Sequence, residues 1–328
     1  MHSTLNNVNK SLPLERTARK YLPADTIPSE YQQILLPQAG YYFRQDHACD
    51  ILSQHLLLGP YSVWLHDILA KGPILLRSFT PIPIFVLQFM FEDSLPVPRA
   101  GYILEERECN GFYLTPGQLY RMPMNTGKKI FSFHINIEPL EMERLAKKYP
   151  QVTHLTTGIH PMVSAPINNH PYHINAVCDM LVRKIMTCKY TGVTARHFLQ
   201  RCCTDILLNY AKQHIDSQMP FIYTSMLRAD TYHNLFNYLS DHPHKIHSLP
   251  EISYMYDIPV EELEHGFEQH FAISIADYLH MGKMMMIWHA IQEHAFPLEE
   301  IAKVTNYKQV ATMLEAVKEY YGFNPVNH

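Results

Sequence analysis

The chain has 328 residues, of which 47% are hydrophobic and 18% charged, which is typical of a folded protein with about two domains. The net charge of −4 is unevenly distributed: residues 1–230 have a net charge of +4, whereas residues 231–328 contain five lysines, no arginine and 13 acidic residues. This composition excludes a chain that binds nucleic acid through a uniformly basic surface, above all at its C-terminal end.

Residues 1–30 mix polar residues with three prolines and show no periodicity, so we expect an extended or mobile arm there. These residues contain no continuous apolar segment, and the most apolar stretch of the chain, residues 81–91, is too short to span a bilayer. We therefore expect no secretory signal, no contact with a membrane and a cytoplasmic location.

Residues 31–160 show short predicted strands separated by turn residues. Residues 84–91 predict a strand with two apolar faces, whereas residues 131–138 predict a strand with one apolar and one polar face. Turns are predicted between strands at Gly59-Pro60, Gly72-Pro73, residues 96–98, Asn110-Gly111 and Pro116-Gly117. This pattern indicates an all-β sandwich or barrel.

Pro139 begins a predicted helix over residues 140–149, with acidic residues early and basic residues late. A β-like segment follows at residues 152–157, and two helices with apolar stripes are predicted near residues 172–189 and 194–215. We assign residues 161–229 to a helical linker. The sequence leaves open whether the apolar stripes serve simple packing or dimerisation.

Residues 230–328 contain two helix-turn-helix patterns. The first covers residues 249–271, the second covers residues 297–325, and a long helix over residues 275–291 joins them. The joining helix is apolar over much of its circumference, so we expect it to contact both helix-turn-helix units.

Helix ends in this region are marked by specific residues. A capping box is predicted at Ser248 with Glu251, and Ser274 with Asp277 repeats the spacing. Asp257 is a candidate cap for the helix that follows it, and Gly322 is expected to end the last helix.

The second pattern contains Glu300-Ile301-Ala302, then Asn306-Tyr307, then Gly322-Phe323-Asn324-Pro325. The first pattern keeps Leu263, Phe267, Phe271 and Tyr278-Leu279. At this spacing, residues 246–325 resemble the AraC/XylS family of bacterial transcription regulators, although that family usually has Gly-Phe at 306–307 and Gly-x-Ser-Pro at 322–325. The resemblance implies an upstream cupin-like β-barrel that senses a ligand and a helical dimerisation segment. That order matches the strands and helices predicted above.

The residues that would contact DNA depart from those of the family. The first recognition helix, residues 260–270, contains four glutamates and no lysine or arginine, and Glu315 stands where an arginine is common in the second. About 6–10 phosphate contacts are common in DNA-binding proteins, and five lysines do not easily supply them. The candidate DNA contacts are Lys303, Lys308, Gln309, Thr312, Lys318, His265 and Lys283.

A sensor domain would bind a small organic molecule through polar and aromatic side chains on or beside its strands. The candidates are Gln88, Tyr120, Ser132, His134 and Asn136. The alternative for each is that it lies on a solvated strand face.

Motifs for catalysis and cofactors are absent from the sequence. We find no P-loop, no dinucleotide-binding glycine motif and no nucleophile elbow, so we expect no enzyme and no cofactor. His55, His66 and His134 lack the spacing of a metal-binding cupin, so we expect no metal. The six cysteines are expected to be buried, reduced thiols.

Taken together, the sequence predicts an α+β protein with an N-terminal cupin-like β-barrel or sandwich, a helical linker pair and a C-terminal all-α tandem helix-turn-helix domain. The predicted domains are an arm over residues 1–30, a sensor over 31–160, a linker over 161–229 and a DNA-binding domain over 230–328. The predicted function is a DNA-binding transcription regulator with a small-molecule sensor. Whether it forms a homodimer is left open. The alternative is a degenerate relative that no longer reads DNA and acts through protein–protein binding or heterodimerisation.

Overall fold

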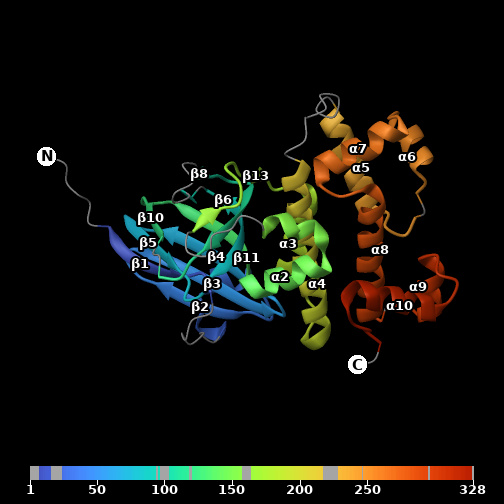
Figure 1. Cartoon of the computed structure of the whole chain (residues 1–328). Coiled ribbons are helices and arrows are strands. Elements are labelled where there is room, and N and C mark those ends of the chain that lie inside the picture. Colours follow the sequence, from blue (N-terminus) through green and yellow to red (C-terminus); the bar gives the residue numbers. More distant parts are fainter. Residues whose placement is uncertain are drawn as a thin grey trace. The chain divides into compact units, whose positions relative to one another are not determined.

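The computed structural model describes residues 7–15, 24–93, 95–96, 103–117, 120–156, 164–216, 228–245, 247–294 and 296–326. The chain divides into two compact units, which we call the first unit (residues 1–174 and 178–189) and the second unit (residues 175–177 and 190–328). The first unit contains the β-sheets and the second contains the tandem helix-turn-helix (Figure 1). The predicted α+β fold class is therefore confirmed.

Two sheets of unequal size form the first unit (Figure 1). The three-stranded sheet has the order β1 (Val8–Pro13), β5 (Ile74–Phe79) and β10 (Tyr120–Met124). The eight-stranded sheet has the order β12 (Ala165–Pro166), β9 (Glu108–Leu114), β6 (Ile84–Glu92), β11 (Lys129–Ile137), β4 (Tyr61–Ala70), β3 (Cys49–Leu58) and β2 (Gly40–Gln45), with β13 (Tyr172–His173) also paired to β9. Among the described strands no pairing joins the two sheets, so the fold is a sandwich and not a closed barrel.

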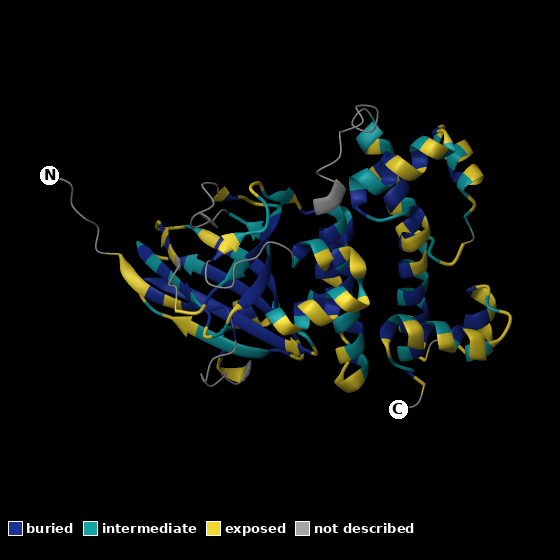
Figure 2. Ribbon diagram, in the orientation of Figure 1, coloured by how far each residue is buried: buried dark blue, intermediate teal, exposed yellow. Residues whose placement is uncertain are grey.

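The core of the first unit lies between the two sheets. One buried apolar cluster combines residues of β1, β5 and β10 with residues of β3, β4, β6 and β11. The side chains on the opposite face of the eight-stranded sheet are also buried, among them Phe85, Phe89 and Phe133, each 0% exposed. Figure 2 shows the central strands of this sheet mainly in the colour of buried residues. Because both faces of this sheet are covered, its central strands are apolar on both sides, as the sequence of β6 indicates.

Short elements complete the first unit. Its helices are η1 (Ala24–Thr26), α1 (Ser29–Gln32), α2 (Pro139–Lys148), η2 (Pro150–Leu155) and α3 (Ala176–Met186), and a small hairpin pairs β7 (Leu95–Pro96) with β8 (Ile103–Leu104). The helix predicted after Pro139 is confirmed as α2. Within the described residues, no helix combines the length and the apolarity that a bilayer crossing requires.

Two local predictions in this unit are wrong, and one predicted helix begins later than expected. Asn110-Gly111 lies inside β9 and not in a turn, because its neighbours pair with β6 over six residue positions. Residues 152–157 were predicted as β-like, but residues 150–155 form the 3₁₀ helix η2, in which Val152 and Leu155 bury one common face. The helix predicted from residue 172 begins at Ala176, because Tyr172–His173 is strand β13.

Part of the predicted N-terminal arm is a strand. Residues 8–13 are extended as expected, but they form β1, which pairs in parallel with β5. Lys10, Leu12 and Leu14 are buried, so this segment belongs to the core of the first unit.

The second unit contains seven helices among its described residues: α4 (Gly192–Asp216), α5 (Ala229–Asp241), α6 (Leu249–Tyr256), α7 (Val260–Phe271), α8 (Ile275–Gln292), α9 (Leu298–Val304) and α10 (Val310–Tyr321). We call α6 and α7 the first helix-turn-helix, and α9 and α10 the second. Figure 1 shows α8 between them. Helix α8 contacts α7, α9 and α10, so the prediction that it contacts both units is confirmed.

Most predicted helix ends in the second unit are confirmed. The capping box at Ser248 and Glu251 is formed in both directions, and Ser274 accepts a hydrogen bond from the backbone N–H of Asp277. Gly322 ends α10 with a φ of 69°. The prediction for Asp257 is wrong, because this residue ends α6 in the left-handed region and does not cap α7.

Candidate ligand cavity and candidate nucleic-acid interface

A cavity lies between the two sheets of the first unit. Its empty volume is about 790 Å³, the opening to solvent included. The apolar part of its wall comes from both sheets and includes Leu12, Leu76 and Met122 on one side and Ile68, Val86 and Ile130 on the other. An apolar wall with a few polar groups is the usual composition of a small-molecule site.

The polar part of the cavity wall comes from Gln88, Ser132 and His134 of the large sheet, from Ser78 of the small sheet, and from Ser164. Ser132, His134 and Ser78 are each at most 4% exposed. The Oγ of Ser132 lies 3.1 Å from Nε2 of His134. Among the described residues, neither Nδ1 of His134 nor Oγ of Ser78 has a hydrogen-bond partner. The cavity therefore has unpaired polar atoms on two opposite sheets.

Behind His134, a row of buried aromatic rings crosses the large sheet. The centroids of His134 and His66 lie 5.1 Å apart, those of His66 and Trp64 5.5 Å, and those of Trp64 and His55 4.5 Å. The row ends at a chain of hydrogen bonds, because Oγ of Ser62 lies 2.9 Å from Nε2 of His55 and donates to Oε1 of Glu15 at 2.9 Å.

Burial keeps His134 and His66 of this row neutral. It lowers the pKa of His134 from 6.5 to about 3. The pKa of His66 is also well below 6.5, first because of burial and second because of the neighbouring His134 and His55. A protonated ring would have to lose its hydration without a compensating anion. At neutral pH both rings therefore act as uncharged hydrogen-bonding groups.

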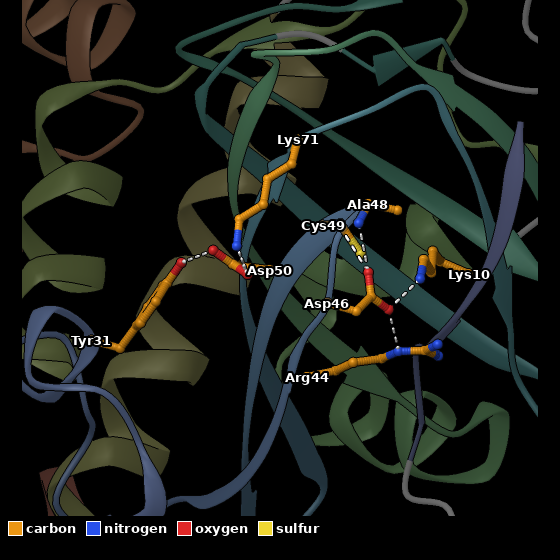
Figure 3. Close-up of polar contacts among 8 residues, drawn as sticks. All are labelled: Lys10, Tyr31, Arg44, Asp46, Ala48, Cys49, Asp50 and Lys71. Atoms are coloured by element: carbon orange, nitrogen blue, oxygen red, sulfur yellow. Dashed lines mark hydrogen bonds and ion pairs between the residues drawn. The ribbon is translucent and has the colours of Figure 1, made fainter.

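A buried ion pair holds strand β1 at the cavity wall (Figure 3). The Nζ of Lys10 donates to Asp46, which also accepts from Arg44 and from the backbone N–H groups of Ala48 and Cys49. The contact with Lys10, followed by those with the backbone of Ala48 and Cys49, lowers the pKa of the Asp46 carboxyl. Because Leu12 follows Lys10 in the same strand, the ion pair also positions part of the cavity wall.

A second set of contacts in Figure 3 joins three segments of the first unit around Asp50. Tyr31 donates to one oxygen of this carboxylate at 3.2 Å, and Lys71 lies 2.6 Å from the other. Burial, followed by the charge of Asp50, raises the pKa of Tyr31. This contact fixes helix α1 against strand β3.

The cavity brings together three of the five predicted ligand-binding residues: Gln88, Ser132 and His134. Asn136 is 1% exposed and does not line the cavity. Its Nδ2 donates to the carbonyl of Leu14, and Leu14 lines the cavity. Tyr120 lies at the start of β10, and its side chain is outside the described residues. The polar face of β11 is thus buried, not solvated.

Sequence reasoning missed Ser78, Ser164 and the ring row of His55, Trp64 and His66. A signal for the row was present in β4, where Ser62, Trp64 and His66 alternate with the apolar residues Val63 and Leu65. Their partners on the neighbouring strand could not be found without the register, in which Ser132 pairs with His66 and His134 with Trp64.

In the second unit, an open groove lies at the turn of the second helix-turn-helix. Lys303, Lys308 and Gln309 line it and are all exposed. Asn306 makes the turn with a φ of 59°, where the family usually has glycine. Asparagine is one of the few side chains that tolerates this conformation. The positive φ of this turn is therefore reached without a glycine.

The remaining candidate DNA contacts lie in different environments. Thr312 is exposed on α10. The ammonium group of Lys283 lies 5.1 Å from the ring centroid of Tyr307, and burial lowers the pKa of Lys283. Lys318 forms an ion pair with Glu315 at 3.4 Å, which partly neutralises both charges.

The first helix-turn-helix presents a different surface. On α7, Glu261 and Glu264 are exposed beside His265. The Nε2 of His265 is hydrogen-bonded to Nε2 of Gln269 at 3.1 Å. Two other acids of this helix have basic partners: Glu262 lies 3.4 Å from Arg228, and Glu268 lies 3.1 Å from Lys212. Glu262 and Glu268 are thus partly neutralised, but the exposed face of α7 carries no lysine or arginine.

All six cysteines are buried and reduced, as predicted. Within the residues that the structure describes, no group of three or more His, Cys, Asp or Glu side chains could hold a metal ion.

No protein-family model matches the sequence, and no curated protein matches it. Several solved structures are similar to it. ToxT from Vibrio cholerae is 8% identical, and the match covers 81% of this chain and 96% of that chain with a TM-score of 0.31. The AraC-like transcriptional activator CuxR is 11% identical, with coverage of 79% and 90% and a TM-score of 0.30. At such values the function has to be inferred from this chain's own residues.

Proposed function

We propose that this chain is an AraC/XylS-like transcription regulator that binds double-stranded DNA through its second unit and a small organic effector in the cavity of its first unit. The proposal includes a cytoplasmic location, dimer formation and no catalytic activity. The observation that carries it is the pair of helix-turn-helix units at the two ends of α8, with exposed Lys303, Lys308 and Gln309 around one groove.

The two helix-turn-helix units differ in what they offer to DNA. The second has lysines for phosphate contacts, and the amide of Gln309 is suited to reading adenine. The first exposes Glu261 and Glu264, and these would repel a phosphate backbone. We infer that the second helix-turn-helix supplies most of the DNA affinity and that binding is weak and sensitive to salt.

The test is the salt dependence of binding to duplex DNA. In a plot of log affinity against log salt, the double variant Lys303→Ala/Lys308→Ala should have a negative slope that is shallower by about 2. Each lost phosphate contact removes about 0.9 from the steepness of this slope. Lys245→Ala, an exposed lysine outside both recognition helices, is the control and should leave the slope unchanged. Fluorescence anisotropy of a labelled duplex, measured from low to physiological salt, gives both slopes.

The acidic surface of α7 favours a second candidate function, in which the module binds protein and no longer reads DNA. Absence of any binding to duplex DNA at micromolar protein and low salt would contradict the proposed regulator and favour this alternative. Equal salt slopes for the wild type and Lys303→Ala/Lys308→Ala would show that DNA binds elsewhere on the chain.

A further inference from the structure

Among the residues that the structure describes, the cavity wall of the first unit contains no charged group. None of the described residues that line it is Lys, Arg, Asp or Glu. The nearest titratable group is His134, which burial keeps neutral because its pKa is about 3. A ligand carboxylate or phosphate would have to leave water here without a cation to receive it, and that cost is large.

The cavity does offer hydrogen bonds to a neutral ligand. Nδ1 of His134 and Oγ of Ser78 have no partner among the described residues, and they come from the two opposing sheets. A buried polar atom without a partner is destabilising, and a ligand group that pairs with it removes that penalty. Gln88 adds an amide that is only half-buried.

The tautomer of His134 restricts the ligand group further. If Nε2 donates to Ser132, Nδ1 is an acceptor and needs a ligand hydroxyl; if Nε2 accepts from Ser132, Nδ1 donates to a hydroxyl or a carbonyl. A hydroxyl group satisfies either tautomer, and it can also bond to Ser78. The rest of the wall is apolar and suits an aliphatic or aromatic body.

We propose that the effector of this protein is an uncharged, mainly apolar alcohol, whose hydroxyl group lies between His134 and Ser78 and whose apolar body fills the space between the two sheets. This inference rests on the proposed function and specifies its ligand class. It excludes sugars, which have too many hydroxyl groups for this wall, and carboxylic acids, which are charged at neutral pH.

The test compares two ligands with the same eight-carbon chain length, one with a neutral hydroxyl group and one with a charged carboxylate. Isothermal titration calorimetry of the full chain with 1-octanol and with sodium octanoate at neutral pH should give an affinity at least about tenfold higher for the alcohol. Equal or tighter binding of octanoate overturns the proposal, and so does the absence of binding for both ligands.

Two buried histidines provide a matched pair of variants. His134→Leu removes the unpaired nitrogen from the cavity wall and should weaken octanol binding by about tenfold, which corresponds to about 1.4 kcal/mol. His66→Leu removes an equally buried neutral ring that does not line the cavity, and should change the affinity less than about twofold. Equal effects of the two substitutions would overturn the assignment. If His134→Leu does not fold, Ser78→Ala takes its place in the test, and we expect it to lower the octanol affinity by less than tenfold.

A positive charge placed in the cavity wall should reverse the ligand preference from octanol to octanoate. Gln88→Lys introduces a cation at a half-buried position of the cavity, so octanoate should then bind more tightly than octanol.

The proposed ligand class and the proposed regulator function can be disproved separately. If octanoate binds tighter to the wild type and changes its DNA affinity, only the ligand class is wrong. If octanol binds but DNA does not, only the regulator function is wrong.

Discussion

At the scale of single residues, the first unit contains polar groups in places where the strand pattern would allow apolar ones. His66 and His134 are 0% and 4% exposed, in the middle of a sheet whose two faces are covered. Each keeps one hydrogen bond to a serine, at 2.9 Å for His66 and 3.1 Å for His134. These contacts stabilise the neutral rings only, because no described acid lies beside either ring to stabilise the protonated form.

The neutral histidines predict a pH dependence of stability. Their folded-state pKa values are lowered from 6.5, so below about pH 6.5 the unfolded chain binds protons that the folded chain does not. Stability should therefore be fully present at neutral pH and decrease as the pH falls, by up to about 1.4 kcal/mol per pH unit for each histidine. Urea unfolding at about pH 7, 6 and 5 measures this slope. His134→Leu should make it shallower, and an unchanged slope would contradict the assignment.

At the scale of elements, both helix-turn-helix units place a short polar residue with positive φ in the turn between their two helices. Asp257 and Asn306 both adopt positive φ, 52° and 59°, between the two helices of their units. Both positions favour glycine, and both hold a short polar side chain that tolerates this conformation. The absence of glycine at these two positions therefore does not indicate a lost turn.

Gly266 in the middle of α7 has a packing reason. A Cβ at this position would lie 2.0 Å from Oη of Tyr232, whose hydroxyl donates to the carbonyl of Glu262 at 2.9 Å. Helix propensity alone predicts that Gly266→Ala stabilises the chain by about 1 kcal/mol. The contact with Tyr232 predicts the opposite sign, a loss of about 2 kcal/mol.

Thermal unfolding of Gly266→Ala distinguishes the two expectations. The control is the same substitution in a Tyr232→Ala background, where the loss should largely disappear because the blocking ring is absent. An increase in Tm for the single variant would show that helix α7 relaxes away from α5 at no cost.

At the scale of the whole molecule, α4 is part of the second unit and contacts both helix-turn-helix units. Asn209 donates to the carbonyls of Phe271 and Ala272, at 2.6 and 3.2 Å, where α7 ends. Arg201 donates to the carbonyl of Tyr320 at 3.3 Å, and the Tyr320 hydroxyl donates to Asp205 at 2.8 Å. The C-terminal half of α4 thus holds α7, and its N-terminal half holds α10.

This arrangement predicts where a stable fragment of the second unit begins. A fragment of residues 190–328 retains α4, whereas a fragment of residues 228–328 exposes the buried end of α7 and loses the contacts of Tyr320. The shorter fragment should unfold at a Tm lower by about 10 °C, since about 1 kcal/mol corresponds to 4–8 °C in a domain of this size. Equal Tm values by circular dichroism would mean that α4 contributes nothing to this unit.

The cavity could be predicted only in part. Three of its polar residues were found because they lie on or beside predicted strands, but Asn136 followed from the same pattern and instead bonds to the carbonyl of Leu14. Ser78 was missed because it comes from the opposing sheet, and nothing local to its strand indicates which strands face it. The groove residues Lys303, Lys308 and Gln309 were easier to predict, since one local turn brings them together.

The sequence by itself determined what depends on contacts within a few residues: the helix caps at Ser248 and Ser274, the end of α10 at Gly322, and the strands β6 and β11. Only the tertiary structure decided what depends on distant partners. Periodicity shows that a strand has a polar face but not what covers that face, and here the polar face of β11 points into the core between the sheets. For the same reason α4 could be predicted as a helix, whereas its place in the second unit follows from contacts with residues about sixty or more positions away.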